Sequence, residues 1–372
     1  MMTFAMNLPK PQNFSSLTAL IGLAFFCLGL QAQPVSELPA SKEGDFIARD
    51  FKFRSGEVMP ELKLHYTTFG QPVRDANGRV TNAVLMLHGT GGAGSSLLRP
   101  IFANVLFGPG QLLDASRYYL ILPDGLGHGK SSKPSDGLRM KFPRYDYDDM
   151  VLAQKRLLEE GLGVNHLRLI LGTSMGCMHA WVWGETWPDF ADALMPLACQ
   201  PVALAGRNRM WRKMLINAIR DDPEWKGGDY KAQPRAGVTA AAQFLVLAGA
   251  APLQAQKSYP TREGADKFTE EAVARAAAGI DANDLLYAVS ASRNYDPSAN
   301  LERIHVPVMY INSADDFINP PELGIAEREI KRVKQGRFVL IPASEETYGH
   351  GTHTRADVWK KYLWELLEAS RK

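Results

Sequence analysis

A serine between two glycines, Gly172-Thr-Ser174-Met-Gly176, is the residue of this chain best suited to covalent chemistry. It follows the apolar run 167–171 and precedes a helical stretch at 178–186, so it lies where a buried strand turns into a helix. Glycines on both sides let such a turn tighten until the serine hydroxyl projects from the end of the strand. The pattern therefore predicts that Ser174 is the nucleophile of an acyl-transfer reaction.

A serine nucleophile needs a base, usually a histidine that a carboxylate orients. Of the eight histidines, four follow the serine along the chain: His179, His305, His350 and His353. His179 lies inside the helix behind the nucleophile, and His305 precedes a strand, so neither follows a suitable acid. His350 lies in a Gly-His-Gly loop after the last predicted strand. We expect His350 to be the base, with His353 as the alternative.

The acid should follow the preceding predicted strand, because the order along chains with this kind of turn is serine, acid, histidine. The strand at 306–311 is followed by two adjacent aspartates, Asp315 and Asp316. Counting back from the two prolines at 320–321, which open the next helix, favours Asp316. Asp315 stays open as the alternative.

An acyl-transfer site also needs donors for the negative charge that develops on the carbonyl oxygen. By position, we expect the backbone amides of Met175, directly after the nucleophile, and Thr90, in the glycine-rich loop that begins at His88. His88 itself is interpreted as a structural loop residue. His350 and His353 have no third ligand at metal spacing, so we expect neither a metal nor a cofactor.

The elements that position these residues alternate between strands and helices. The predicted strands are 46–53, 62–69, 83–87, 118–122, 167–171, 191–197, 306–311 and 337–341. Helices are predicted between and after these strands at 147–160, 178–186 and 358–369. Such alternation is typical of an α/β fold with a mostly parallel sheet flanked by helices. The alternation stops at about 201–304, where helical patterns at 210–220, 238–248 and 266–278 indicate a lid inserted over the sheet.

Composition limits the class of protein. The 372 residues are 45% hydrophobic and 22% charged, which is ordinary for a globular protein and excludes a disordered chain. The formal net charge is +2, so no basic field is available to hold a nucleic acid. Three cysteines are too few for a disulfide scaffold.

The N-terminal segment, residues 1–32, is predicted to be a secretory signal peptide. Its single charge, Lys10, precedes the apolar run 17–30, which is short for a membrane span, and a small residue follows at Ala32. An uncleaved anchor is the alternative. We therefore expect a mature domain at 33–372 that is periplasmic or secreted and has no stable membrane association after cleavage. In an oxidising compartment Cys177 and Cys199 could pair, but we favour the alternative of two small residues buried beside the core, and nothing in the sequence decides between the two.

With Ser174, Asp316 and His350 in these places, the chain resembles α/β-hydrolase-fold proteins, and within that fold the homoserine O-acetyltransferase group. The similarity begins at about residue 46 and is densest in three segments: 148–176, 218–230 and 348–350. The resemblance implies a Ser-Asp-His triad, covalent acylation of the serine, a helical lid over a tunnel and a homodimer formed through the lid.

Two departures from the group bear on the reaction. Its acetyltransferases usually carry an arginine for the amino-acid carboxylate where this chain has Ile216-Asn217, and their nucleophile motif ends Gly-Gly where this chain has Gly176-Cys177. Loss of a buried guanidinium would weaken recognition of a carboxylate. Export would also separate the enzyme from acetyl-coenzyme A, a cytoplasmic donor.

The sequence therefore predicts an exported serine hydrolase that cleaves a carboxylic ester, or a related acyl bond, through an acyl-enzyme on Ser174. The alternative is an acyltransferase of the homoserine O-acetyltransferase kind, in which an alcohol takes the acyl group in place of water. Both reactions use the same residues, so the lid and the compartment must separate them. The expected partner is a small-molecule ester or other acyl substrate.

Overall fold

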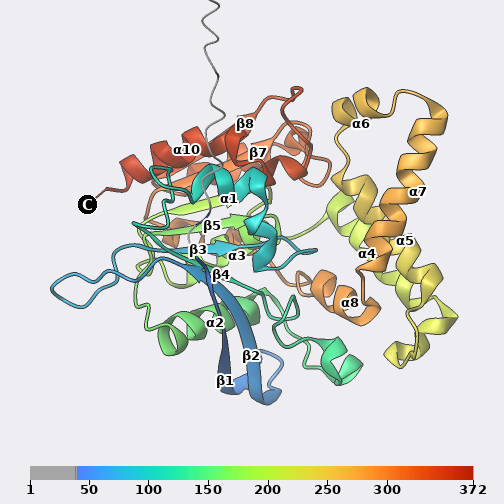
Figure 1. Cartoon of the computed structure of the whole chain (residues 1–372), viewed down its shortest axis with the longest axis horizontal. Helices are drawn as coiled ribbons and strands as arrows, with labels where there is room; N and C mark the ends of the chain where they lie inside the picture. The colour runs from blue at the N-terminus through green and yellow to red at the C-terminus, as the bar shows by residue number, and fades with distance from the viewer. Residues whose placement is uncertain (1–37, 39, 372) are drawn as a thin grey trace, which may run out of the picture. The chain divides into compact units, whose positions relative to one another are not determined.

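The computed structural model describes residue 38 and residues 40–371, so the predicted signal peptide lies outside the described residues. Within them, eight strands form one sheet (Figure 1). The strands are β1 (Lys42–Lys52), β2 (Val58–Phe69), β3 (Ala83–Leu87), β4 (Tyr119–Pro123), β5 (Leu169–Thr173), β6 (Leu194–Leu197), β7 (Val308–Ser313) and β8 (Gly336–Ile341). Each predicted strand corresponds to one of these; the bounds of 83–87 agree with β3, and the others are shifted at one end or both.

The strand order is β1-β2-β4-β3-β5-β6-β7-β8. β2 pairs antiparallel with both β1 and β4, and the other neighbouring pairs are parallel. The prediction of a mostly parallel sheet is confirmed. Because parallel strands end at the same edge, the loops after β3, β5 and β7 meet there. This edge of the sheet carries the residues singled out above.

Ten α-helices accompany the sheet in the described part of the chain. They are α1 (Pro100–Leu106), α2 (Tyr147–Arg156), α3 (Met175–Thr186), α4 (Gly206–Arg220), α5 (Arg235–Gly249), α6 (Pro252–Ser258), α7 (Arg262–Ala278), α8 (Ala282–Ser290), α9 (Ile325–Glu329) and α10 (Ala356–Ala369). The sequence patterns did not predict α1, α6, α8 or α9, which are short. Helices this short show too few turns for a clear apolar period.

The two faces of the sheet pack against different helices. Along β3, Val84 and Met86 join an apolar cluster with α1 and α10, whereas Leu85 and Leu87 join a second cluster with α2 and α3. Successive side chains of a strand point to opposite faces, so a strand that is apolar throughout is buried on both. The continuous apolar runs read from the sequence reflect this double burial.

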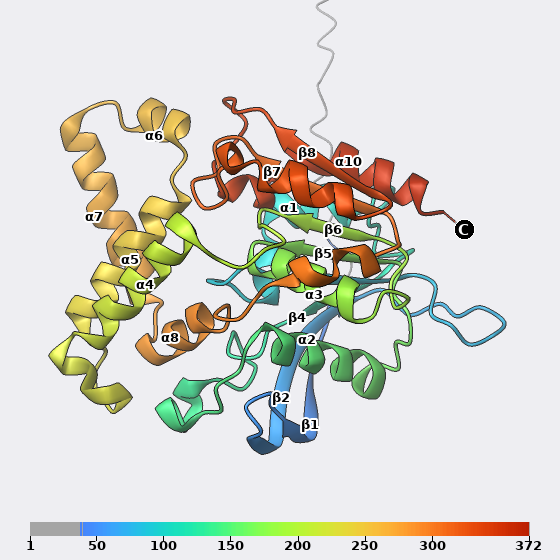
Figure 2. The ribbon, with the colours of Figure 1, turned by 180° about the vertical axis from the view of Figure 1, so that it is seen from behind.

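The lid consists of α4 to α8, inserted between β6 and β7. Figure 2 shows α4, α5 and α7 grouped to one side of the sheet. These helices enclose an apolar cluster of their own, which includes Trp211, Leu215, Ile219 and Leu286. α4 begins at Gly206, four residues before the predicted start at 210. The sequence did not predict this earlier start, because the first turn of the helix is polar and shows no apolar period.

Among the described residues, no single helix is long and apolar enough to cross a membrane. α5 and α6 reach that length and composition only when taken together, and the chain bends by 102° between them.

Candidate active site

Ser174 occupies a strained turn between β5 and α3. Its φ is 54° and its ψ is −109°, and a positive φ of this kind is costly for a residue with a side chain. A Cβ added to Gly172 would collide with the carbonyl oxygen of Gly176, and one added to Gly176 would collide with that of Leu87 in β3. Both glycines are therefore required by close backbone approach, as the sequence pattern predicts.

The structure brings Ser174, His350 and Asp316 into one hydrogen-bonded chain. The Ser174 hydroxyl donates to His350 Nε2 over 2.8 Å, and His350 Nδ1 donates to the two carboxylate oxygens of Asp316 over 3.0 and 3.1 Å. His350 is 9% exposed and Asp316 only 2% exposed. The imidazole is thus placed to take the serine proton while the carboxylate fixes its orientation.

The loop after β7 holds Asp316 as a carboxylate. The backbone amides of Ile318 and Asn319 donate to it over 2.8 and 3.2 Å, and the Asn319 side chain donates over 3.0 Å. Burial opposes ionisation of Asp316, but attraction to the His350 imidazole and these donors outweigh it, so the pKa of Asp316 lies below its usual value. Asp316 is therefore ionised when it faces the imidazole.

The two alternatives left by the sequence have other contacts. The Asp315 carboxylate accepts hydrogen bonds from Thr347 Oγ1 and the Gly349 amide, both over 2.9 Å, and therefore fastens the histidine loop to β7. His353 Nδ1 contacts the carbonyl oxygen of His350, and burial lowers the pKa of His353 to about 3. Neither side chain hydrogen-bonds to Ser174.

The two amides expected to bind the carbonyl oxygen lie beside the serine. Met175 is the first residue of α3, where a helix leaves its amides without intrahelical partners. Thr90 lines the same cavity as Ser174, and the neighbouring Gly89 approaches the serine so closely that an added Cβ would lie 3.3 Å from Ser174 Cβ. In the described part of the chain, neither amide donates a hydrogen bond.

His88 anchors the loop that carries Thr90. Its Nε2 accepts a hydrogen bond from the Gly125 amide over 2.9 Å, so its proton is on Nδ1, which donates to the carbonyl oxygen of Gly89 over 2.8 Å. Burial lowers the pKa of His88 to about 3. A neutral imidazole bonded on both nitrogens supports the loop and is not available as a base.

The cavity above Ser174 lies between the sheet edge and the lid and encloses about 280 Å³. The glycine-rich loop and the histidine loop form one wall, and Trp211, Arg212 and Leu245 of the lid form another. Two other lid aromatics, Trp225 and Phe244, pack against the lid's apolar cluster and do not line the cavity. Trp211 and Leu245 pack with this cluster and also line the cavity.

Arg212 is a residue of this site that the sequence reasoning missed. It is 3% exposed and lines the cavity, with Nε donating to Asn208 Oδ1 over 2.9 Å and Nη1 donating to Ser292 Oγ over 3.2 Å. No carboxylate among the described residues pairs with it, and burial lowers the pKa of Arg212. Its spacing from Ile216, four residues along a predicted helix, was the available signal, because such positions share one face.

Cys177 and Cys199 form a disulfide, which the sequence left open, and their Cα atoms are 5.8 Å apart. Cys177 lies in the first turn of α3, and Cys199 follows β6. The bond therefore ties the helix behind the nucleophile to the end of the adjacent strand.

Comparison with known proteins places this arrangement in a family. Residues 82–347 match the family model described as alpha/beta hydrolase fold. A probable acyltransferase from Methanothermobacter thermautotrophicus is 30% identical over 291 residues, which cover 78% of this chain and 86% of the relative. A homoserine O-acetyltransferase from Pelobacter propionicus is 28% identical over 344 residues, covering 82% and 90%.

A solved structure of an acetylester hydrolase from Corynebacterium glutamicum superposes with a TM-score of 0.77 at 20% identity, covering 88% of this chain and 96% of the other. The predicted resemblance to the homoserine O-acetyltransferase group is confirmed, and so is an enzyme of the esterase or acyltransferase kind. The chain belongs to the α/β-hydrolase fold family.

Proposed function

We propose that this enzyme transfers an acyl group, by way of Ser174, to the hydroxyl of an acceptor that carries a carboxylate, as in the homoserine O-acetyltransferases. The observation that carries the proposal is the buried guanidinium of Arg212, which shares the cavity of Ser174 and has no acidic partner among the described residues. A buried charge is costly unless it is paired. A substrate carboxylate would supply the missing partner.

This role for Arg212 bears on one of the two departures from the homoserine O-acetyltransferase group, the loss of an arginine for the substrate carboxylate. Ile216-Asn217 replace the arginine expected for carboxylate recognition, and Ile216 packs in the lid's apolar cluster. Arg212 offers a guanidinium one helical turn earlier, on the same helix. The probable acyltransferase and the homoserine O-acetyltransferase among the relatives also favour transfer over simple hydrolysis.

In the proposed reaction, Ser174 Oγ attacks the acyl carbonyl of the donor while His350 Nε2 takes the serine proton. The amides of Met175 and Thr90 stabilise the negative charge on the carbonyl oxygen. The bond to the leaving group then breaks, His350 returns the proton to that group, and the acyl group stays on Ser174. The acceptor hydroxyl next gives its proton to His350 and attacks the acyl-serine. The bond between the acyl carbon and Ser174 Oγ then breaks, and His350 returns the proton to Ser174 Oγ.

Ester hydrolysis is the second candidate, with water replacing the acceptor. The disulfide between Cys177 and Cys199 favours it, because disulfides persist in oxidising compartments, where the predicted signal peptide would direct the chain. We also propose that the enzyme is periplasmic or secreted. We further propose a homodimer through the lid, where the apolar side chain of Leu247 is 62% exposed.

The test measures how the acyl-enzyme divides between the two acceptors. Purified protein is given p-nitrophenyl acetate with increasing homoserine, or with 3-aminopropan-1-ol, which keeps the hydroxyl and amine but lacks the carboxylate. We expect O-acetylhomoserine to form at the expense of acetate, and little acetylated aminopropanol. Acetate as the only product at every homoserine concentration would establish the hydrolase instead.

Arg212→Gln tests the carboxylate site directly. It should reduce transfer to homoserine by about 10- to 100-fold, the size expected for a lost charge-assisted pair, while p-nitrophenyl acetate cleavage changes little. The matched control is Lys213→Ala, which removes an exposed cation from the same helix. Ser174→Ala should abolish both reactions.

A further inference from the structure

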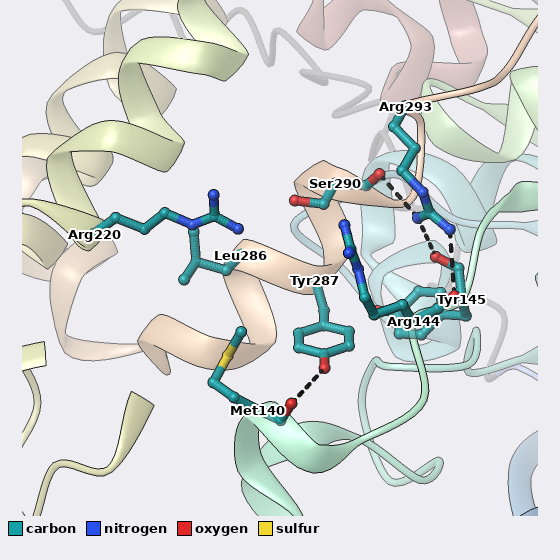
Figure 3. Close-up of a pocket in the computed structure, with 8 residues that line it drawn as sticks. All are labelled: Met140, Arg144, Tyr145, Arg220, Leu286, Tyr287, Ser290 and Arg293. Atoms are coloured by element: carbon teal, nitrogen blue, oxygen red, sulfur yellow. Dashed lines mark hydrogen bonds between the residues drawn. The ribbon is translucent and has the colours of Figure 1, made fainter. Parts of the chain in front are cut away.

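A second cavity, outside the one that holds Ser174, is lined by three arginines. It encloses about 290 Å³ between α8, the end of α4 and the segment that precedes α2 (Figure 3). The lining residues include no carboxylate: Met140, Arg144, Tyr145, Arg220, Leu286, Tyr287, Ser290 and Arg293. Three guanidinium groups around one small space create a strongly positive site.

The wall of this cavity is held in place by hydrogen bonds from α8 and the turn that follows it. The Tyr287 hydroxyl donates to the carbonyl oxygen of Phe142 over 2.5 Å. Arg293 Nη1 donates to the carbonyl oxygen of Tyr145 over 2.6 Å, and Arg293 Nη2 donates to that of Arg144 over 3.2 Å. These bonds fix the backbone that carries Arg144 against the lid.

Two of the three guanidinium groups form no ion pair, although the Glu57 carboxylate lies near Arg144 and accepts a hydrogen bond from its backbone amide over 3.4 Å. Arg293 is balanced in part by Asp146, whose carboxylate lies 4.0 Å away. Arg144 and Arg220 make no side-chain hydrogen bond or ion pair with any residue that the structure describes. Figure 3 shows them reaching toward the cavity from opposite sides, with Ser290 between them at the end of α8. Two unpaired guanidinium groups and a hydroxyl suit an oxyanion with several charges.

From this geometry we infer that the cavity is a binding site for a small polyvalent oxyanion, a phosphate or carboxylate compound, held by Arg144, Arg220 and Ser290. Arg220 belongs to the lid and Arg144 to the segment between β4 and α2, so the bound anion would link the lid to the body of the sheet. The inference does not depend on the reaction proposed for Ser174.

The test uses inorganic pyrophosphate, inorganic phosphate and citrate as probes with the purified protein, at ionic strength held constant with sodium chloride. We expect saturable binding in calorimetry, and a rise in melting temperature on the order of 5 °C at saturation. Tighter binding of pyrophosphate or phosphate assigns the site to phosphoryl groups, and tighter binding of citrate assigns it to carboxylates. Absence of saturable binding for all three would overturn the inference.

The variants Arg144→Ala and Arg220→Ala should each raise the dissociation constant at least about 10-fold. Both side chains lack hydrogen-bond partners, so neither variant should unfold the protein. The control Lys213→Ala, which removes one exposed positive charge from α4, should leave binding unchanged. Equal losses in all three variants would show a non-specific charge effect and contradict the proposed site.

Discussion

The carboxyl edge of the sheet and the lid enclose the same cavity, but they hold their residues differently. At the sheet edge, Ser174, His350 and Asp316 are joined by hydrogen bonds of 2.8 to 3.1 Å, and backbone donors fix the aspartate. The lid contributes apolar side chains and one buried guanidinium, and it leaves other apolar residues, such as Leu247, exposed.

This difference separates the chemistry from the choice of substrate. Groups that must move protons need geometry within a few tenths of an ångström, and strands and tight turns provide it. A helical insertion can change its side chains without disturbing those groups. Variants at the sheet edge should therefore slow the reaction for every acyl substrate, whereas lid variants should change the ratio between substrates.

The largest expected effect comes from Asp316→Asn. The asparagine keeps the shape of the side chain but cannot stabilise an imidazolium, so kcat with p-nitrophenyl acetate should fall about 10³- to 10⁴-fold. Asp315→Asn is the matched control, because its carboxylate contacts Thr347 and the Gly349 amide but not the imidazole. We expect it to lower kcat less than about 10-fold. Similar losses in both variants would contradict the assignment of Asp316.

The second largest effect is expected at the turn that holds the nucleophile. In Gly176→Ala the new methyl group would overlap the carbonyl oxygen of Leu87, so urea unfolding should show a loss of about 3 kcal/mol in stability, together with lower activity. Gly249→Ala at the end of α5 is the matched lid control, because no atom lies within 4 Å of the added Cβ. It should change stability by less than about 1 kcal/mol. Equal losses of stability in the two variants would contradict the difference between the sheet edge and the lid.

The residues at the sheet edge were predictable because each leaves a signal in the sequence. Strands buried on both faces read as continuous apolar runs, and the close approach around Ser174 excludes any side chain at its two flanking glycines. The choice between Asp315 and Asp316 was harder, since adjacent loop residues differ only in direction. The hydrogen bonds from Ile318 and Asn319 determine that direction, and they form only in the folded loop.

The lid was predictable as a helical insertion but not in its contacts. Arg212 and Arg220 lie on one helix and look alike in the sequence as surface cations. Arg212 is nevertheless 3% exposed in the cavity of Ser174, whereas Arg220 lines the second cavity, which three arginines surround. Which face of α4 meets which partner depends on packing against α5 and α8, whose contacts are distant in sequence. The disulfide was undetermined for the same reason, because β6 and α3 meet only in the folded sheet.

Acid should lower the stability of the sheet and the helices around it, which we call the sheet body, through their buried imidazoles. The lid between 201 and 304 contains no histidine. Burial lowers the pKa of four histidines, all outside the lid: His88, His128, His179 and His353. Their neutral forms are favoured in the folded protein, so the unfolded chain binds more protons as the pH falls below 6.5. Stability contributed by these groups is complete above that pH and is lost as the pH falls toward the lowered pKa of each, which is about 3 for His88 and His353.

Four carboxyls oppose this loss, because burial raises the pKa of Asp148, Asp149, Glu185 and Asp284. The pKa of Asp149 and of Asp284 is raised to about 6, so each takes up a proton in the folded protein and favours folding as the pH falls. An imidazole whose pKa is about 3 in the folded protein, as in His88 and His353, should change the slope of stability with pH by about 1.4 kcal/mol per unit near pH 5, and each raised carboxyl opposes that change.

Urea unfolding at pH 7, 6 and 5 measures this slope, and His353→Asn isolates one imidazole. The asparagine can still donate to the carbonyl oxygen of His350 but cannot take up a proton, so the slope should fall by about 1.4 kcal/mol per pH unit. The variant should therefore lose less stability than the natural protein between pH 6 and pH 5. An unchanged slope would mean that His353 is already protonated in the folded protein, and this imidazole would then contribute nothing to the acid sensitivity that distinguishes the region outside the lid.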